Sequence, residues 1–261
     1  NYKVYKMLRR TKIVATLGPA TEDREVLKKV LAAGVNVVRL NFSHGSAEDH
    51  INRAKLVREI SKELGIYVGI LGDLQGPKIR LGELPEAIDI VNGQTITLST
   101  QPSSPDALPV DYPALPESVE ADDILLLDDG LMRIRVVSVR GLDIECKVEI
   151  GGLLKSRKGI NKLGGGLSAP ALTEKDYADL SFIIEHNFDY VAVSFPSCRA
   201  DIDSVQTKLR EYGADIHVIA KIERAEAVAS DEALCGIIDA SDGVMVARGD
   251  LGVEVGSAQL I

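Results

Sequence analysis

The stretch His217-Val218-Ile219-Ala220-Lys221-Ile222-Glu223 is an apolar run that ends in two charged residues, spaced two apart. Because the side chains of a β-strand alternate between its two faces, Lys221 and Glu223 are predicted to leave the same face together. The stretch Gly243-Val244-Met245-Val246-Ala247-Arg248-Gly249-Asp250 repeats this pattern and places Arg248 and Asp250 in phase at the end of another predicted strand. The two stretches therefore predict a site where two carboxylates and two cations converge.

Outward from these runs, buried strands alternate with capped helices. Strands are predicted at residues 11–17, 36–42, 67–74 and 189–195, and helices at 21–33, 46–64, 173–186 and about 201–212. Ser46 is a candidate N-cap of the second helix, and Gly65 follows its last residue, where a left-handed conformation is needed. A repeat of about 25 to 30 residues is typical of a parallel α/β barrel or a doubly wound sheet.

The long interval between the third and fourth predicted strands indicates an insertion at residues 79–171. It contains short alternating segments at 94–99, 124–127, 132–139 and 142–150, separated by turns rich in Gly, Asp and Pro. Many short strands at regular spacing predict a small all-β domain. Near its exit, Gly164-Gly165-Gly166 superficially resembles a phosphate-binding loop, but no Walker lysine follows it, so a flexible hinge is favoured.

Six strands of the alternating pattern are predicted, whereas a closed (β/α)8 barrel needs eight. We therefore expect a barrel interrupted after its sixth strand, with roughly 50 residues of barrel absent beyond Ile261. The predicted domains are residues 1–78 (strands 1–3), the insertion at 79–171, and residues 172–261 (strands 4–6).

Composition favours an ordinary cytosolic enzyme. The chain has 261 residues, 45% of them hydrophobic, and a net charge of -9, which disfavours a nucleic-acid surface. Its three cysteines, Cys146, Cys198 and Cys235, form no CxxC pair and are expected to be reduced thiols. No segment is long and apolar enough for a signal sequence or a membrane span, so a soluble cytoplasmic protein without a membrane partner is expected.

Polar residues follow the predicted strands where these end, as expected if reactive groups collect at one face of a barrel. Besides the charged residues already quoted, this group comprises Arg39, Asn41, Ser43, Asp73 and Ser194. Glu223 and Asp250 suit a hard cation such as Mg²⁺, and Lys221 and Arg39 suit a transferable phosphate. The alternative is that these residues only form salt bridges that cap the strands; four of them on different strands weaken it.

Two further features concern ligand binding. The segment Ala247-Arg248-Gly249-Asp250-Leu251-Gly252 has two glycines and precedes a predicted helix start, so its amides suit a carboxylate or phosphate. His44 is a candidate general base, but beside Ser43 and Gly45 it is interpreted as a loop hydrogen-bonder or ligand contact, and no proton transfer is assigned to it.

Five motifs, in order along the chain, resemble the pyruvate kinase family. They are Thr11-Lys12-Ile13-Val14-Ala15-Thr16-Leu17-Gly18-Pro19, Val38-Arg39-Leu40-Asn41-Phe42-Ser43-His44-Gly45, Gly76-Pro77-Lys78-Ile79-Arg80, Ala220-Lys221-Ile222-Glu223 and Met245–Asp250. The resemblance implies an α/β fold: a (β/α)8 TIM barrel, here truncated after about six strands, with an all-β lid domain inserted after strand 3. It also implies the last step of glycolysis, phosphoenolpyruvate plus ADP to pyruvate plus ATP.

The resemblance assigns roles residue by residue. Lys221 and Arg39 would be catalytic, Lys221 by stabilising the phosphoryl group in flight and Arg39 by binding phosphate, while Glu223 and Asp250 would hold Mg²⁺ or Mn²⁺. The substrate would be bound by Arg39, Ser194, Ala247, Arg248, Gly249 and Asp250, and the nucleotide by Pro19, Asn41, His44 and Arg80. A loose transition state needs mainly positioning and charge neutralisation from such groups. The threonine that protonates enolpyruvate in the family would lie beyond Ile261.

Lys78 stands where potassium-dependent members of the family carry Glu. The site region would comprise Asn41, Ser43, Asp73 and Leu74, and the ammonium of Lys78 is expected to replace K⁺ there. Leu74, Gln75 and Leu81 also match the branch that looks potassium-independent, so K⁺ is expected not to be required. The alternative is a solvated surface lysine.

The segment Asn161-Lys162-Leu163-Gly164-Gly165-Gly166-Leu167-Ser168 is similar to bacterial isozymes activated by AMP or sugar phosphates. The resemblance implies an allosteric homotetramer whose effector pocket belongs to a C-terminal domain absent from this chain. Two alternatives remain open on the sequence: a Mg²⁺-dependent lyase or aldolase acting on the enolate of a 2-oxo acid, and an inactive fragment that only binds Mg²⁺ or nucleotide.

Overall fold

A computed structural model describes residues 10–102, 104–167, 170 and 172–256. The chain forms two compact units, each built from three segments. The first unit comprises residues 1–75, 174–193 and 205–219, and the second comprises residues 76–173, 194–204 and 220–261. Ser168, and the predicted domain limits at residues 1, 171 and 261, lie outside the described residues.

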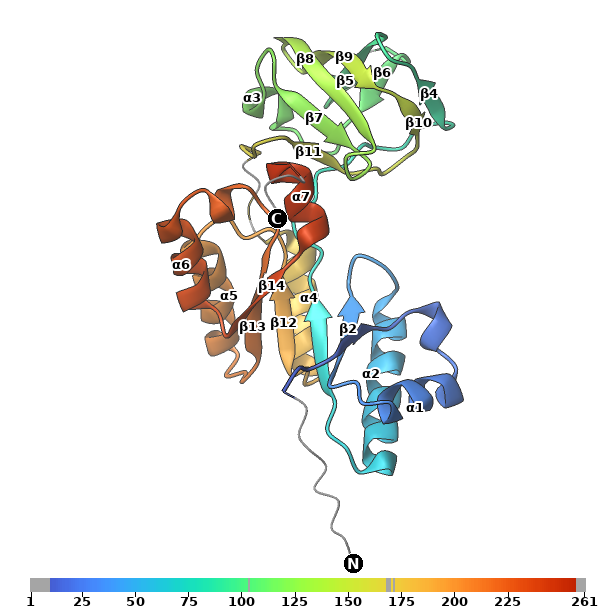
Figure 1. The fold of residues 1–261 in the computed structure, drawn as a ribbon, viewed down its shortest axis with the longest axis vertical. Helices are drawn as coiled ribbons and strands as arrows, with labels where there is room; N and C mark the ends of the chain where they lie inside the picture. The colour runs from blue at the N-terminus through green and yellow to red at the C-terminus, as the bar shows by residue number, and fades with distance from the viewer. Residues whose placement is uncertain (1–9, 103, 168–169, 171, 257–261) are drawn as a thin grey trace, which may run out of the picture. The chain divides into compact units, whose positions relative to one another are not determined.

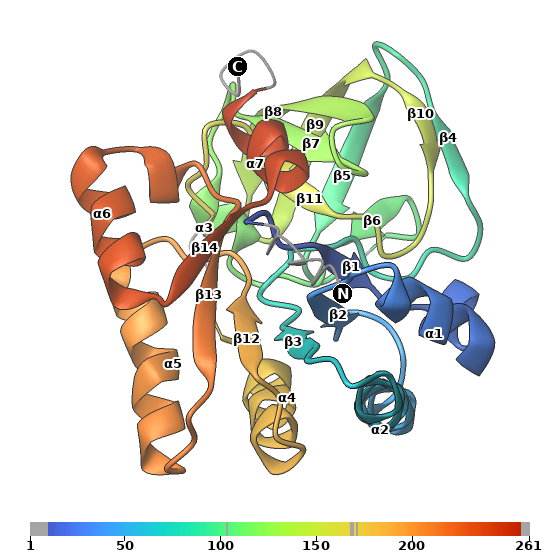
Figure 2. The same cartoon turned by 60° about the horizontal axis from the view of Figure 1, so that its bottom comes forward.

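The first unit contains parallel strands covered by helices. The strands are β1 (Val14–Thr16), β2 (Val37–Asn41), β3 (Gly69–Asp73) and β12 (Tyr190–Val193), which pair in that order, followed by the start of β13 (His217–Ile222). The helices are η1 (Pro19–Thr21), α1 (Arg24–Ala32), α2 (Ala47–Leu64), α4 (Glu174–Glu185) and most of α5 (Arg199–Glu211). Figures 1 and 2 show β1, β2, β3 and β12 following a curve with α1, α2 and α4 on its outer side.

Local sequence explains these elements. In β2, Val38 and Leu40 are fully buried on one face, while Arg39 and Asn41 occupy the other, as the alternation of a strand requires. The cap predictions for α2 are confirmed: Ser46 is the N-cap, and Gly65 ends the helix in the left-handed region at φ 63°. The predicted strand and helix ends shift by a few residues, and α1 starts after its N-cap Asp23 rather than at residue 21.

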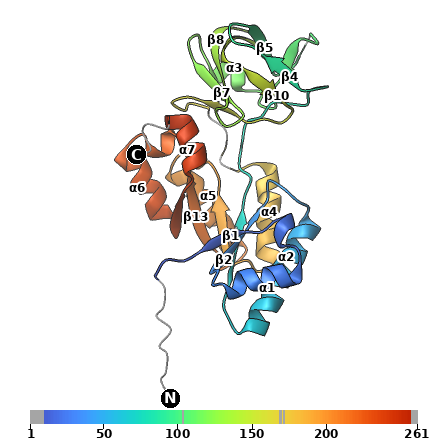
Figure 3. The same cartoon turned by 45° about the vertical axis from the view of Figure 1, so that its right-hand side comes forward.

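The second unit contains two further sheets. One has the order β11-β7-β8-β9-β5-β6, formed by β5 (Thr95–Ser99), β6 (Ala107–Pro109), β7 (Ile124–Leu127), β8 (Met132–Arg140), β9 (Asp143–Ile150) and β11 (Ile160–Lys162). The other pairs β4 (Ile88–Ile90) with β10 (Gly152–Leu154) (Figure 3), and the single short helix among described residues 79–167 is α3 (Leu115–Ser118). A hydrophobic cluster that runs from Ile79 to Leu167 fills this region.

The remainder of the second unit follows the end of β13. It comprises η2 (Glu226–Val228), α6 (Asp231–Ala240), β14 (Gly243–Val246) and α7 (Arg248–Val255), and β14 neighbours β13. The prediction that Arg248 and Asp250 share a phase at the end of a strand is wrong, because β14 ends at Val246 and both residues lie in the first turn of α7. At about 100° per residue, two positions apart on a helix lie on nearly opposite sides.

The cysteine prediction is confirmed, since Cys146, Cys198 and Cys235 are all free. Cys146 is buried, which raises the pKa of its thiol to about 12, whereas Cys198 and Cys235 are exposed. Among the described helices, none combines the length and the apolar character needed to cross a membrane.

Candidate active site

Lys221 and Glu223 form a buried ion pair at the end of β13. Their side chains leave the same face of the strand, as predicted, and Lys221 Nζ lies 2.8 Å from Glu223 Oε1. The ammonium of Lys221 also donates a hydrogen bond of 2.8 Å to Ser194 Oγ. Glu223 and Ser194 are each 1% exposed. Three of the predicted site residues are therefore brought into one buried cluster.

The backbone next to this cluster is strained. Phe195 has φ 58°, a left-handed conformation that is unusual for a bulky residue. Its backbone N–H donates a hydrogen bond of 2.9 Å to Glu223 Oε2. Such outliers persist where the surrounding structure fixes them, often at functional sites. The strained turn thus holds one oxygen of Glu223 and leaves the other toward Lys221.

Electrostatics make Glu223 the unusual member of the cluster. Burial raises the pKa of its carboxyl, the charge of Lys221 opposes this, and the negative charge of Asp250 adds to the rise. Glu223 Oε1 has the ammonium of Lys221 as its partner, and the charge and the hydrogen bond of Lys221 both act to lower the pKa of Glu223. An added cation near both carboxylates would relieve their mutual repulsion.

Asp250 contacts a lysine from the segment that leads out of β3. Lys78 Nζ lies 3.2 Å from Asp250 Oδ1 and 3.0 Å from Asp129 Oδ1. Burial alone would lower the pKa of Lys78, but the two carboxylates outweigh it and the pKa is raised. Lys78 is therefore a fixed positive charge, partly buried, and not a freely solvated surface lysine.

The donor set fits a divalent cation of the magnesium type. Glu223 offers a buried carboxylate that is paired with Lys221, and Asp250 offers a half-buried carboxylate whose negative charge acts to raise the pKa of Glu223. Within the described ranges, no group of three or more His, Cys, Asp or Glu side chains is arranged to hold a metal. Mg²⁺ commonly takes only one or two carboxylates and completes its shell with water and substrate oxygens.

The start of α7 carries the predicted anion-binding amides. The N–H of Ala247 donates to the carbonyl of Ile222 at 3.2 Å, which ties this turn to the end of β13. The amides of Arg248, Gly249 and Asp250 lie in the first helical turn, where N–H groups have no acceptor within the helix. The side chain of Arg248 is exposed.

In the first unit, Arg39 is held by Asp73 and Thr16. Arg39 Nε donates to Asp73 Oδ2 at 2.6 Å, its Nη2 lies 2.5 Å from the same oxygen, and its Nη1 donates to Thr16 Oγ1 at 3.0 Å. Asp73 is 1% exposed, whereas a quarter of the Arg39 side chain is accessible. The guanidinium is thus fixed at one edge and open at another, as an anion-binding arginine requires.

The other predicted residues occupy separate positions. Asn41 pairs with Asp73 across β2 and β3 and accepts a 3.0 Å hydrogen bond from the N–H of Ser43, and Leu74 is buried. Pro19, in η1, and His44 are exposed in the first unit. Arg80 belongs to the second unit, where it donates to the carbonyl of Arg157 at 3.0 Å.

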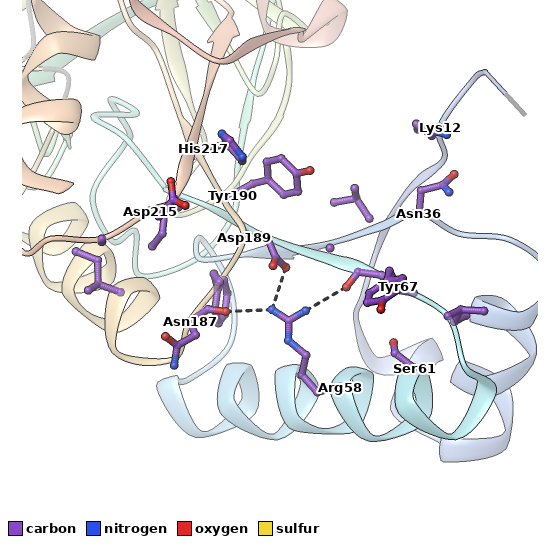
Figure 4. Close-up of a pocket in the computed structure, with 18 of the residues that line it drawn as sticks. Lys12, Asn36, Arg58, Ser61, Tyr67, Asn187, Asp189, Tyr190, Asp215 and His217 are labelled. Carbon is purple, nitrogen blue, oxygen red and sulfur yellow. Dashed lines mark hydrogen bonds and ion pairs between the residues drawn. The ribbon is translucent and has the colours of Figure 1, made fainter. Parts of the chain in front are cut away.

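A large open cavity of about 1230 Å³ lies elsewhere in the first unit (Figure 4). It is lined by residues where β2, β3 and β12 begin, the opposite end of these strands from Asn41 and Asp73. Arg58 is fully engaged there, donating to the carbonyls of Val68 and Asn187 and pairing with Asp189 at 2.9 Å. These contacts join α2 to the strands, so we interpret the region as structural.

Sequence reasoning missed the partners of the predicted residues. Asp129 and Thr16 are 51 and 23 residues distant from the side chains that they hold, and no spacing rule links positions so far apart. The only local signal was Asp128-Asp129-Gly130, a turn sequence, and all three residues have positive φ.

The chain is similar in sequence to proteins of one known family. Residues 8–261 match the family model described as the barrel domain of pyruvate kinase. The chain is 52% identical to pyruvate kinase II of Salmonella typhimurium, over 98% of this chain and 54% of that protein. It is 49% identical to a pyruvate kinase of Haemophilus influenzae (98% and 55%) and 41% identical to one of Thermococcus litoralis (94% and 52%). The chain thus spans about half the length of the curated relatives it matches.

Proposed function

This chain belongs to the pyruvate kinase family, and from that membership we propose that the protein containing it transfers the phosphoryl group of phosphoenolpyruvate to ADP, giving pyruvate and ATP. The observation that carries the proposal is the buried contact of Lys221 with both Ser194 and Glu223. A buried ammonium that contacts both a hydroxyl and a carboxylate suits a site that receives an anionic group together with a metal ion.

The residues have distinct roles in this proposal. Lys221 donates to the phosphoryl oxygens as charge develops on them, and Ser194 orients its ammonium. Glu223 and Asp250 hold Mg²⁺ or Mn²⁺, which supplies neutralisation of phosphate charge when bound. The first-turn amides of α7, at Arg248, Gly249 and Asp250, bind the substrate carboxylate; the amide of Ala247, the fourth in the prediction, supports the turn through Ile222.

The roles in the first unit rest on the family resemblance together with local geometry. Arg39 binds phosphate, and its fixation by Asp73 and Thr16 supports this because little side-chain freedom is left to lose on binding. The family resemblance assigns nucleotide contacts to Pro19, Asn41 and His44, and separately to Arg80.

We also propose that K⁺ is not required. Lys78 places a permanent positive charge against Asp250, and its raised pKa keeps that charge at neutral pH. The family resemblance assigns the monovalent-cation region itself to Asn41, Ser43, Asp73 and Leu74. A Lys78→Glu variant is expected to lose most activity without K⁺ and to regain it when K⁺ is added. A parent enzyme whose rate rises more than tenfold with K⁺ would contradict the assignment.

We also propose the finer fold assignments. Residues 1–78 and 172–261 would be parts of a (β/α)8 barrel, and residues 79–171 its inserted all-β lid. The hydrogen bonds from Gly164 to Glu254 and from Gly166 to Glu226 argue against the predicted hinge at these glycines. The full-length protein would be a cytoplasmic, allosterically activated homotetramer. The lyase or aldolase alternative is not favoured, because curated pyruvate kinases match nearly the whole chain.

A lactate dehydrogenase-coupled assay with phosphoenolpyruvate, ADP and Mg²⁺ tests the proposal, run with and without K⁺ on this chain and on the longer protein. We expect activity in the longer protein and none in this chain alone. A folded longer protein without activity would refute the assignment.

A further inference from the structure

Glu254 is a buried carboxylate to which the mechanism above gives no role. It lies four residues after Asp250 on α7, one helical turn away, so the two side chains share a side of the helix. It is 6% exposed. Burial raises the pKa of its carboxyl, and hydrogen bonds from Ala225 and Asn161 oppose that rise.

The partners of Glu254 come from two other segments. Its Oε2 accepts a 2.9 Å hydrogen bond from the backbone N–H of Ala225, two residues after Glu223. Its Oε1 accepts a 3.2 Å hydrogen bond from Asn161 Nδ2 on β11. The helix bearing Asp250 is thus fastened directly to the loop bearing Glu223.

Neighbouring contacts make this fastening stiff. The backbone N–H of Gly164 donates to the carbonyl of Glu254 at 2.8 Å. Arg224, which is 6% exposed, donates to the carbonyl of Leu167, and the N–H of Gly166 donates to the carboxylate of Glu226. The loop after Glu223 and the end of α7 therefore share one framework, the segment 161–167.

We propose that Glu254 is a positioning residue that holds the carboxylate of Asp250 at the correct separation from Glu223 for one shared divalent cation. The inference rests on the proposed function, since it takes these two residues as the metal ligands. The hydrogen bond to Ala225 carries this role, and the bond to Asn161 serves only the stability of the framework. Residues that orient metal ligands in this way typically contribute ten- to a hundredfold to metal affinity.

The test is Mn²⁺ affinity of the full-length protein without substrates, measured by electron paramagnetic resonance of free Mn²⁺. Glu254→Ala is expected to weaken Mn²⁺ binding at least tenfold. Glu254→Gln, whose amide oxygen still accepts from Ala225, is expected to stay within about threefold of the parent. In kinetics, Glu254→Ala should raise the KM for Mg²⁺ while kcat at saturating Mg²⁺ changes little.

Asn161→Ala is the matched structural control, because it removes the other hydrogen bond of the same carboxylate. It should lower the unfolding temperature much as Glu254→Ala does and leave Mn²⁺ affinity within about threefold. Equal weakening in both variants would overturn the proposal, since it would make Glu254 merely structural. If Glu254→Ala does not fold, Glu254→Asp, which shortens the side chain by one methylene, must show the loss instead.

Asp250→Asn separates this inference from the proposed function. If Asp250→Asn binds Mn²⁺ like the parent protein, the metal site itself is wrong and both proposals fall. If Asp250→Asn loses Mn²⁺ while folded Glu254→Ala or Glu254→Asp keeps it, only the role of Glu254 is refuted.

Discussion

At the scale of single residues, Lys221 and Glu223 lie two positions apart, so their side chains leave the same face of the strand and can form an ion pair. One ammonium contacts Ser194 and Glu223 because both lie beside the same strand end. In a buried setting, removing one partner of such a pair leaves the other charge uncompensated. The same contacts that fix the ammonium of Lys221 also make this residue costly to replace.

Replacement of Lys221 by methionine is therefore expected to reduce kcat of the full-length enzyme at least about a hundredfold, the usual scale for losing a charge-stabilising donor. The coupled assay at saturating substrates measures this. Lys208→Met, at an exposed pair with Glu211, is the control and should keep the parent rate. A Lys221→Met enzyme that folds and retains more than a tenth of parental kcat would argue against its assigned role.

His50 is a second residue-scale feature, in the first unit. Its ring is 3% exposed and stacks on Phe42 at 4.3 Å between centroids, and neither ring nitrogen has a hydrogen-bond partner among the described residues. Burial lowers the pKa of His50, and the charge of Arg53 acts in the same direction; Asp179 and Asp49 oppose this, and Lys175 lowers the pKa further. His50 is thus kept neutral.

The lowered pKa of His50 determines the direction in which its titration changes the stability of the fold with pH. As pH falls below about 6.5, the unfolded chain takes up a proton at this position before the folded one does, so stability is lost until the lowered folded pKa is reached. His50→Phe, which keeps the stack and cannot titrate, should remove that loss, which has a ceiling of about 1.4 kcal/mol per pH unit. Urea midpoints of both proteins between pH 7.5 and 5.5 measure it; parallel curves would contradict the prediction.

At the scale of elements, sequence patterns identified strands and helices better than their junctions. The run from residue 243 has the alternation of a strand, yet the chain turns at Ala247 and Asp250 lies on a helix. Two glycines and a helix start were visible in the sequence, but alternation alone does not tell where a strand stops. The negative charge of Asp250 still acts to raise the pKa of Glu223, whereas the side chain of Arg248 is exposed.

The ends of α2 offer an element-scale prediction. Ser46 and Asp49 form a reciprocal capping box, in which each side chain accepts from the backbone N–H of the other. Ser46→Ala should lower the free energy of unfolding by about 1 kcal/mol, and Ser46→Asn, which keeps an acceptor, by much less. Urea denaturation followed by circular dichroism tests both; equal losses would show that the cap is unimportant.

At the scale of the whole molecule, one hydrophobic cluster falls within the predicted insertion. Every buried residue of that cluster lies between Ile79 and Leu167, within the predicted limits of 79–171. A region with its own hydrophobic core is a candidate for independent folding, although it shares a compact unit with residues 194–204 and 220–261. The interruption of the strand spacing is what predicts this insertion, because the βα repeat leaves no other place for so many short strands.

A polypeptide of residues 79–171 is accordingly expected to fold by itself. A dispersed amide NMR spectrum and a cooperative thermal transition would support this. Leu127→Asp, which places a charge at a fully buried core position, should abolish both, while Glu117→Ala, at an exposed site of α3, should preserve them. A collapsed spectrum for the parent fragment would refute independent folding.

What the sequence left open at this scale was the pairing of distant side chains. Lys78 with Asp129, and Glu254 with Ala225 and Asn161, join segments far apart along the chain. Such pairs depend on packed tertiary structure, and neither periodicity nor charge count encodes them. The polar residues at the strand ends could be predicted to lie near one another, because the topology of a parallel sheet alone brings these ends to one edge.

The unequal environments of the three thiols make the chain suitable for single-site labelling. Maleimide dyes attack thiolates, so buried Cys146, with its pKa raised to about 12, should stay unmodified while exposed Cys198 and Cys235 react. Replacing Cys235 with serine would leave one fluorophore at Cys198, four residues after Ser194. Its emission would then report occupancy of the neighbouring cluster in real time, without turnover.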